Sequence, residues 1–286
     1  MTEGPTFIGV GPEKTGTTWV DYNLGKQPDF WLPPIKELRF FWEDMAVPGE
    51  GVIDRFFRGD EWHKQQYRAY LKKQTRSFLA DPVPALTSAR SRTLWDLSYL
   101  FRRHTDDWYL ANFRHSNAPH RGEVSPQYFF LPEPQVQKIR SLLPDVKIII
   151  TLREPVAWCW SFCKMIERQG ELQRDYGGVR DFFEQKARLN SFSDAASRWL
   201  HYFGEDAQVF FYEDLQLDGR KFLGSILNFL DVDERRRNFD GVTDSLNPGG
   251  SDQIPQELQF FAKSLFRDDV LRLEQVLGSL PSCWTA

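Results

Sequence analysis

Three short apolar runs, at residues 7–10, 146–152 and 209–212, stand out from the mixed polar and apolar positions around them. Runs of this length that end at turn residues are typical of buried strands, and Gly11 and Pro12 end the first of them. The second run, VKIIITL, is nearly continuous and rich in β-branched residues, which is typical of a central strand in a parallel sheet. We therefore predict three buried β-strands at these positions.

Between and beyond these runs, apolar side chains recur at helical spacing. Pro155 follows the second strand closely and suits the first turn of a helix. The pattern predicts single helices at residues 17–25, 61–79, 155–168, 219–230 and 255–278, one or two helices over 92–114, and two helices over 178–204. Strands that alternate with helices indicate one α/β domain over residues 1–286, with a central parallel sheet flanked by helices and a helical insertion.

The composition excludes several classes of protein. The chain has 286 residues, of which 41% are hydrophobic and 27% charged, so global disorder is excluded. Its net charge of −4 argues against a nucleic-acid partner. The longest strongly apolar run, at 146–152, is far too short to cross a membrane, and the N-terminus lacks the basic segment of a signal peptide. We expect no membrane partner.

The cysteines bear on the compartment and on metals. The chain has three, Cys159, Cys163 and Cys283, and this odd number is no disulfide framework. No second cluster of Cys or His completes a four-ligand zinc set. We therefore expect reduced, buried thiols, a cytoplasmic location and no metal.

The first strand is followed by a loop and helix start with the sequence GPEKTGTTW, from Gly11 to Trp19. It nearly fits the nucleotide-binding pattern Gly-x(4)-Gly-Lys-Ser/Thr, but Thr17 stands in the position of the lysine, and Lys14 lies two residues before Gly16. A strand, a glycine loop and a helix N-terminus in this order leave unpaired N–H groups that bind an anion. The loop adds the charge of Lys14 and several hydroxyls.

A second candidate anion site follows the central strand. Arg153 stands at its carboxyl end, beside the start of the helix that Pro155 opens, and Ser161 lies eight residues after Arg153. An arginine at this edge of a parallel sheet is well placed to clamp an anionic group.

The segment Lys-Thr-Gly-Thr-Thr-Trp after a leading strand resembles the 5′-phosphosulfate loop of the sulfotransferases that use 3′-phosphoadenosine 5′-phosphosulfate (PAPS) as donor. The resemblance implies that Lys14 neutralises the leaving phosphate and that Trp19 stacks on adenine. It implies that Arg153 and Ser161 bind the 3′-phosphate, and that the glycine loop at 246–251 closes over the nucleotide. The implied donor-binding residues are Lys14, Thr15, Gly16, Thr17, Thr18, Trp19, Arg153, Ser161, Gly249, Gly250 and Ser251.

On the acceptor side the sequence resembles the carbohydrate (heparan-type) branch of that family. The segment 122–129, GEVSPQYF, is similar to one motif of that branch, and residues 36–41, KELRFF, to its Lys-Glu-x-His-Phe-Phe motif. The resemblance implies that Glu37 is the catalytic base, with Lys14 as the catalytic cation. Arg39 stands where the branch has His, and Val124 where it has Lys. The residues expected at the acceptor are Glu37, Arg39, Phe40 and Trp42.

These features predict an enzyme that transfers a sulfuryl group from PAPS to a hydroxyl or amine of a sugar or small natural product and releases 3′-phosphoadenosine 5′-phosphate (PAP). The alternatives are a P-loop kinase or nucleotide hydrolase, and a non-catalytic relative that binds nucleotide or glycan. If Glu37 is not the base, His120, His104 and Glu123 are the next candidates, in that order. The resemblance covers residues 6–42 and 121–280; residues 43–120 have no counterpart and are expected to shape the acceptor site.

Overall fold

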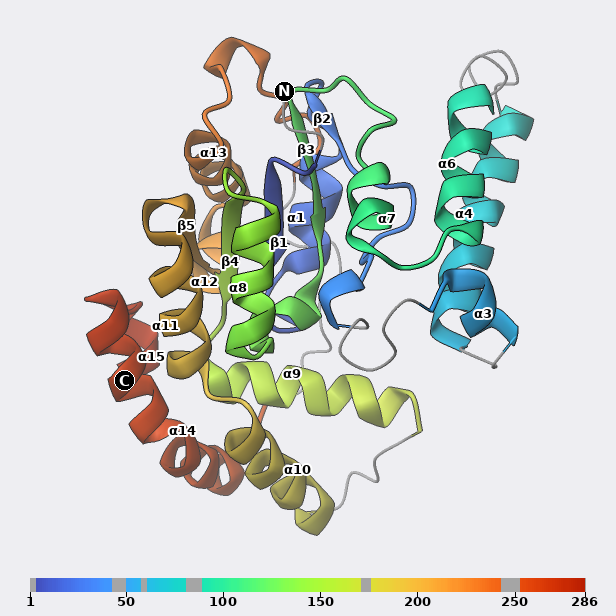
Figure 1. The fold of residues 1–286 in the computed structure, drawn as a ribbon. Coiled ribbons are helices and arrows are strands. Elements are labelled where there is room, and N and C mark those ends of the chain that lie inside the picture. The colour runs from blue at the N-terminus through green and yellow to red at the C-terminus, as the bar shows by residue number, and fades with distance from the viewer. Residues whose placement is uncertain are drawn as a thin grey trace.

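The computed structural model describes residues 4–42, 50–57, 61–80, 89–170, 176–242 and 253–285. In these residues the chain forms one five-stranded sheet with the order β2-β3-β1-β4-β5, in which all neighbours are parallel (Figure 1). The strands are β1 (Phe7–Val10), β2 (Phe30–Trp31), β3 (His120–Val124), β4 (Lys147–Leu152) and β5 (Ala207–Phe211). The predicted α/β class and parallel sheet are confirmed; β2 and β3 lie outside the predicted strands.

Helices cover both faces of the sheet, as the lack of polar alternation in its strands requires. Along β4, Ile148 and Ile150 belong to one apolar cluster and Ile149 to another, because successive side chains point to opposite faces. α1 (Thr17–Leu24) and α13 (Gly219–Phe229) supply the second cluster. On the other face, Figure 1 shows α8 (Glu133–Leu142) and α11 (Phe192–Phe203) lying along the sheet.

The remaining helices surround this layered body. Two connect or follow the central strands, α9 (Pro155–Arg168) and α10 (Tyr176–Leu189), and the chain ends in α14 (Gln256–Leu277) and α15 (Ser282–Thr285). The two helices predicted over 178–204 are confirmed as α10 and α11 (Phe192–Phe203). Outside the insertion, the other described elements are a short helix, α12 (Tyr212–Leu217), and three 3-10 turns, η1 (Pro126–Phe130), η2 (Gly204–Asp206) and η3 (Glu234–Arg236).

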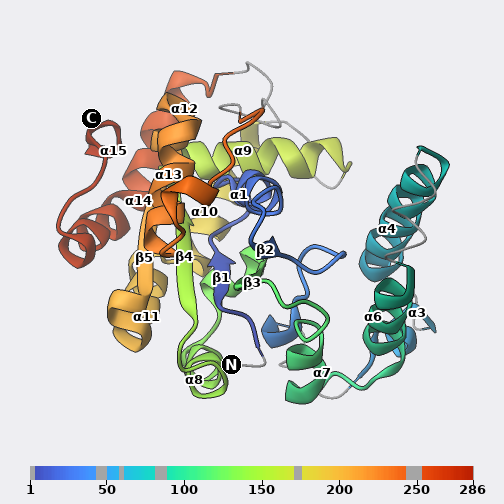
Figure 2. The ribbon, with the colours of Figure 1, turned by 90° about the horizontal axis from the view of Figure 1, so that it is seen from above.

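The insertion forms a helical group beside the sheet, as Figures 1 and 2 show. Its helices are α3 (Val52–Phe57), α4 (Glu61–Ala80), α6 (Ala89–Phe101) and α7 (Asp106–Ala111). α7 returns the chain to the body, where Trp108 and Tyr109 are buried. No helix among the described residues is long and apolar enough to cross a membrane.

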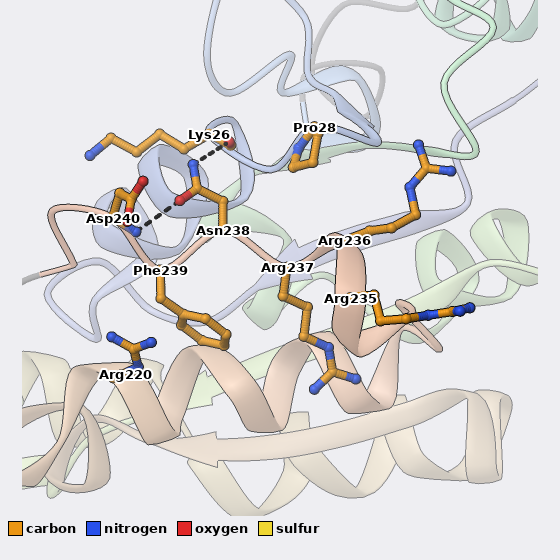
Figure 3. A pocket seen from close by; sticks show the side chains of 9 residues that line it. All are labelled: Lys26, Pro28, Arg220, Arg235, Arg236, Arg237, Asn238, Phe239 and Asp240. Atoms are coloured by element: carbon orange, nitrogen blue, oxygen red, sulfur yellow. Dashed lines mark hydrogen bonds between the residues drawn. The ribbon is translucent and has the colours of Figure 1, made fainter.

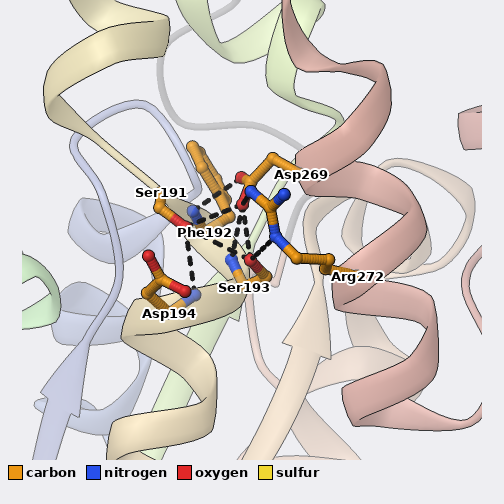
Figure 4. Close-up of polar contacts among 6 residues, drawn as sticks. All are labelled: Ser191, Phe192, Ser193, Asp194, Asp269 and Arg272. Carbon is orange, nitrogen blue, oxygen red and sulfur yellow. Dashed lines mark hydrogen bonds and ion pairs between the residues drawn. The ribbon is translucent and has the colours of Figure 1, made fainter.

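A buried carboxylate ties the last long helix to α11 (Figure 4). Asp269 of α14 accepts hydrogen bonds from the backbone N–H groups of Phe192 (2.7 Å) and Ser193 (3.2 Å), and from the hydroxyls of Ser191 (2.8 Å) and Ser193 (2.6 Å). The first turn of α11 therefore finds its acceptor in another helix. Asp269 is 8% exposed, so these donors have little access to water.

Removal of this carboxylate should destabilise the protein strongly. Asp269→Ala leaves several buried donors unpaired, and we expect the free energy of unfolding to fall by about 3 kcal/mol in urea denaturation. The matched control is Asp194→Ala, which removes an exposed carboxylate from the first turn of α11, the turn that Asp269 contacts, and should cost under about 1 kcal/mol. Equal losses in the two variants would contradict this account.

Candidate active site

The loop between β1 and α1 has the strand–loop–helix geometry that the sequence predicts. Gly16 precedes α1 with a left-handed backbone (φ 90°), and no side chain caps the N-terminus of this helix. A Cβ at Gly16 would lie 3.0 Å from a side-chain carbon of Leu215, so a larger residue would not fit without a shift. The first N–H groups of α1 thus remain available to an anion.

The hydroxyls of this loop differ in their surroundings. Thr15 is fully buried; its hydroxyl donates to the carbonyl of Pro12 (2.7 Å) and lies 2.8 Å from the hydroxyl of Thr151. This side chain therefore braces the loop, and only its backbone can reach a ligand. Thr17 is 4% exposed, whereas Thr18 is exposed and accepts a hydrogen bond from Lys36 (2.9 Å).

Trp19 does not lie where adenine stacking requires it. The ring is 3% exposed and packs edge-on against Phe222 at 5.7 Å between centroids, in the apolar cluster that joins α1 to α13. A ring enclosed in this way has no free face for a nucleotide. In this structure Trp19 is a core residue, and the implied stacking role is not supported.

Lys14 and Arg153 meet at the carboxyl edge of the sheet. The guanidinium of Arg153 donates to the backbone carbonyl of Lys14 (3.2 Å) and lies over the ring of Tyr212 at 4.6 Å. Burial lowers the pKa of both side chains, and the neighbouring charges of Arg153, Lys164 and Arg168 lower that of Lys14 further. A group of cations that lowers the pKa of Lys14 in this way favours the binding of an anion beside it.

The start of α9 is already occupied by a carboxylate. Glu154 accepts hydrogen bonds from the N–H groups of Val156 (3.1 Å) and Ala157 (2.6 Å). A ligand phosphate at Arg153 would therefore bind the guanidinium and not these N–H groups. Ser161 is partly exposed on α9. Gly249, Gly250 and Ser251 lie outside the described residues.

Glu37 is connected to the N-terminus of α1 through one lysine. The ammonium of Lys36 lies 3.2 Å from Oε1 of Glu37 and donates to the hydroxyl of Thr18. The other oxygen, Oε2, accepts from the side-chain amide of Gln127 in η1 (3.1 Å). The structure thus brings the predicted base and the predicted donor loop together.

The other expected acceptor residues differ in placement. Phe40 is fully buried and stacks on Tyr109 of α7 at 5.2 Å, so it is a core residue and does not line an open acceptor site as expected. Trp42 is 39% exposed, and Arg39 is partly exposed beside Glu37. A role for these two at the acceptor stays a prediction.

The two histidines considered as alternative bases lie elsewhere. His104 is 2% exposed and packs on Trp108 at 3.9 Å between ring centroids. His120 begins β3 and stacks on Phe30 at 4.7 Å. Because the strands are parallel, that position is at the opposite edge of the sheet from the loop after β1. Neither ring is placed to act on an acceptor beside Lys14.

Two carboxylates that sequence reasoning missed share this region. Burial raises the pKa of Asp21, on α1, to about 6; the charge of Lys36 opposes this shift and that of Glu37 adds to it. Burial also raises the pKa of Glu13, and the charge of Glu37 contributes. Glu13 directly precedes Lys14, and Asp21 lies one helical turn after Thr17. Their positions next to the Gly11–Trp19 motif could therefore have identified both carboxylates from the sequence.

A basic concavity of about 510 Å³ lies beyond the other end of α1 (Figure 3). Its cations point in different directions in Figure 3, and two of them, Arg235 and Arg236, pair with Asp233 and Asp29. They do not converge on one anion. α1 has eight residues and is therefore about 12 Å long, which separates this concavity from the loop after β1.

Asp21 gives the site a measurable pH dependence. In the folded protein the carboxyl of Asp21 stays protonated up to a pH of about 6, whereas in the unfolded chain it ionises at a lower pH. The free energy of unfolding of the wild type therefore falls as the pH rises towards about 6. Asp21→Asn lacks this loss. In urea denaturation, the free energy of unfolding of the variant relative to wild type should increase by about 1–3 kcal/mol as the pH rises from about 4 to about 6. Above a pH of about 6 the difference between the two proteins should stay constant. A difference independent of pH would contradict this assignment, and Asp194→Asn is the exposed control.

Comparison with known proteins places this arrangement in a family. A sequence profile described as "Sulfotransferase family" matches residues 5–236, whereas no curated protein matches the sequence. Among solved structures, a sulfotransferase from Alicyclobacillus acidocaldarius is 22% identical, with 99% of both chains covered and a TM-score of 0.66. The sulfotransferase domain of the Synechococcus PCC 7002 olefin synthase is 20% identical, with 97% of both chains covered and a TM-score of 0.54.

At these identities the structural likeness shows the fold, and the profile match shows the family. The matched residues include the loop after β1, Glu37 and Arg153. The chain therefore belongs to the sulfotransferase family and is an enzyme of sulfuryl transfer.

Proposed function

We propose that the protein transfers the sulfuryl group of PAPS to a hydroxyl or amine of a carbohydrate or small-molecule acceptor, with Glu37 as general base. The observation that carries this proposal is the contact of Lys36 with both Glu37 and Thr18. It sets a proton acceptor beside the helix N-terminus that would hold the phosphosulfate. A base must lie within hydrogen-bond reach of the proton that it removes.

The residues around the loop fit an anionic donor. Lys14 and Arg153 are enclosed cations whose pKa values are lowered, and the first turn of α1 is uncapped. The 5′-phosphosulfate would bind the loop and Lys14, and the 3′-phosphate would bind Arg153 and Ser161. Oriented charges of this kind stabilise negative charge as it develops on a leaving group.

The chemical step is an in-line displacement at sulfur. The acceptor oxygen or nitrogen forms a bond to sulfur, while the bond from sulfur to the phosphate oxygen of the donor breaks. The acceptor proton passes to Glu37, and the electron pair of the broken bond stays on the phosphate of PAP, where Lys14 offsets the charge. The products are the sulfated acceptor and PAP.

A P-loop kinase or hydrolase is the weaker alternative, because Thr17 occupies the position of the lysine that such enzymes place on the triphosphate. Incubation with PAPS or ATP and a panel of acceptors, followed by mass spectrometry of the nucleotide product, separates the two. We expect PAP from PAPS in the presence of a chelator. A protein that binds PAP but forms none from PAPS with any acceptor would instead support the non-catalytic alternative.

Arg153→Ala should weaken the binding of PAP. A charge-assisted contact to phosphate contributes about 1.5–3 kcal/mol, so we expect the Kd for PAP to rise on the order of 10–100-fold in calorimetry. Arg153 also donates to the carbonyl of Lys14, so its loss should disturb the loop slightly. The Kd for adenosine 5′-phosphate, which lacks the 3′-phosphate, should therefore rise only a few-fold. Equal losses for both nucleotides would show that Arg153 acts through the loop alone.

Glu37→Gln should lower turnover strongly without weakening the binding of the donor nucleotide. The amide keeps the shape of the side chain but accepts no proton, so we expect kcat to fall about 10²–10⁴-fold, with the Kd for PAP within two-fold of wild type. The control is Glu205→Gln, an exposed carboxylate before β5. Wild-type turnover in Glu37→Gln would remove the base role from this residue.

A further inference from the structure

The turn that carries Glu37 has an unusual backbone. Glu37 (φ 60°) and Arg39 (φ 56°) both adopt the left-handed region, which is costly for residues with a side chain. Leu38 between them is 1% exposed. Two such residues on either side of a buried one persist only where the surrounding structure holds them in place.

The group that contacts this turn is a buried carboxylate on the neighbouring strand. Glu123 of β3 is 2% exposed, and its Oε2 accepts a hydrogen bond from the backbone N–H of Leu38 (3.0 Å). The same oxygen accepts from the hydroxyl of Ser125 (2.5 Å), and Oε1 accepts from the hydroxyl of Tyr128 (3.1 Å). The carboxylate thus joins the end of β3 and the start of η1 to the peptide that follows Glu37.

Burial of the Glu123 carboxylate carries a large desolvation cost. Burial raises the pKa of Glu123 to about 7, although interactions with Ser125, Tyr109, the backbone of Leu38 and Tyr128 oppose the shift. No ion pair compensates Glu123 among the residues that the structure describes, so hydrogen bonds alone offset its desolvation. An apolar side chain would fill the same space at lower cost, but it would offer no acceptor to the N–H of Leu38.

We propose that Glu123 is a positioning residue, whose carboxylate fixes the strained turn at Leu38 and thereby aims Glu37 at the acceptor beside the donor loop. The segment that follows Glu123 also holds the side chain of Glu37: Gln127, in η1, donates a hydrogen bond to Oε2 of Glu37. Backbone and carboxylate are therefore both anchored to β3 and η1. This inference rests on the proposed role of Glu37.

The test uses one disruptive variant, one conservative variant and one matched control. Glu123→Ala removes the acceptor of the Leu38 N–H, and we expect kcat to fall about 10–100-fold with the Kd for PAP within two-fold of wild type. Glu123→Gln can keep its oxygen on Leu38 and turn its amide towards Tyr128, whose hydroxyl can accept, so kcat should stay within about three-fold. Tyr128→Phe removes a donor to Glu123 but leaves the Leu38 bond, and kcat should stay within about three-fold.

A loss of positioning is distinguished from a loss of stability by comparing kcat only among variants that are folded. Thermal unfolding and PAP binding establish that each variant is folded at the assay temperature. If Glu123→Ala is unfolded, Glu123→Asp, whose shorter side chain withdraws the acceptor, replaces it with the same expected fall in kcat. Loss of PAP binding in step with kcat, in a folded variant, would overturn the proposal, because a general structural defect affects both.

A double-mutant cycle shows whether Glu123 acts through Glu37. In the Glu37→Gln background, Glu123→Ala should change the residual turnover by less than about three-fold, because the residue that it positions no longer accepts a proton. An additive loss in the double variant would overturn the positioning role while leaving Glu37 as base. Full turnover in the single variant Glu37→Gln would instead overturn the proposed function itself.

Discussion

The site depends on the attachment of the loop after β1 to β4 and α9. Three contacts make this attachment: the hydroxyl of Thr15 meets that of Thr151 (2.8 Å), Arg153 donates to the carbonyl of Lys14 (3.2 Å), and the indole of Trp158 donates to the carbonyl of Glu13 (2.8 Å). The carbonyls that hold the loop belong to the residues whose side chains face the site. These contacts hold the loop in its left-handed backbone at Lys14 (φ 75°).

Much of this arrangement follows from the sequence because motifs at the ends of parallel strands share one edge of the sheet. The strand before Gly11 and the strand before Arg153 were both predictable from apolar runs, and parallel pairing of β1 with β4 brings their carboxyl ends together. β3 was not predictable in the same way. Its sequence, HRGEV, has one large apolar residue, because Glu123 is a buried polar anchor and His120 stacks at the sheet edge.

The predictions that failed concern aromatic residues, for which a motif position does not determine the neighbours. Trp19 occupies the position of a stacking ring, but Phe222 of α13, more than two hundred positions later, encloses it. Phe40 follows the base in its motif, but the insertion returns through α7 and covers it with Tyr109. Since residues 43–120 have no counterpart in the motifs, the sequence gives no sign of that cover. Local pattern predicts a backbone turn better than it predicts long-range packing.

One departure from the carbohydrate-branch motifs, Val124 in place of Lys, has a physical reason in the packing of the sheet. Val124 is 1% exposed and belongs to the apolar cluster that α1 and α13 cover, so a lysine at this position would be buried there without a place for its charge. The cation paired with Glu37 comes instead from Lys36, the residue before it, which also reaches Thr18. Lys36 therefore brings a positive charge beside the turn whose Leu38 N–H donates to Glu123. A change in that turn would move the proposed base, Glu37, and Lys36 together, which would tie the geometry of the proposed proton transfer to that of the donor loop.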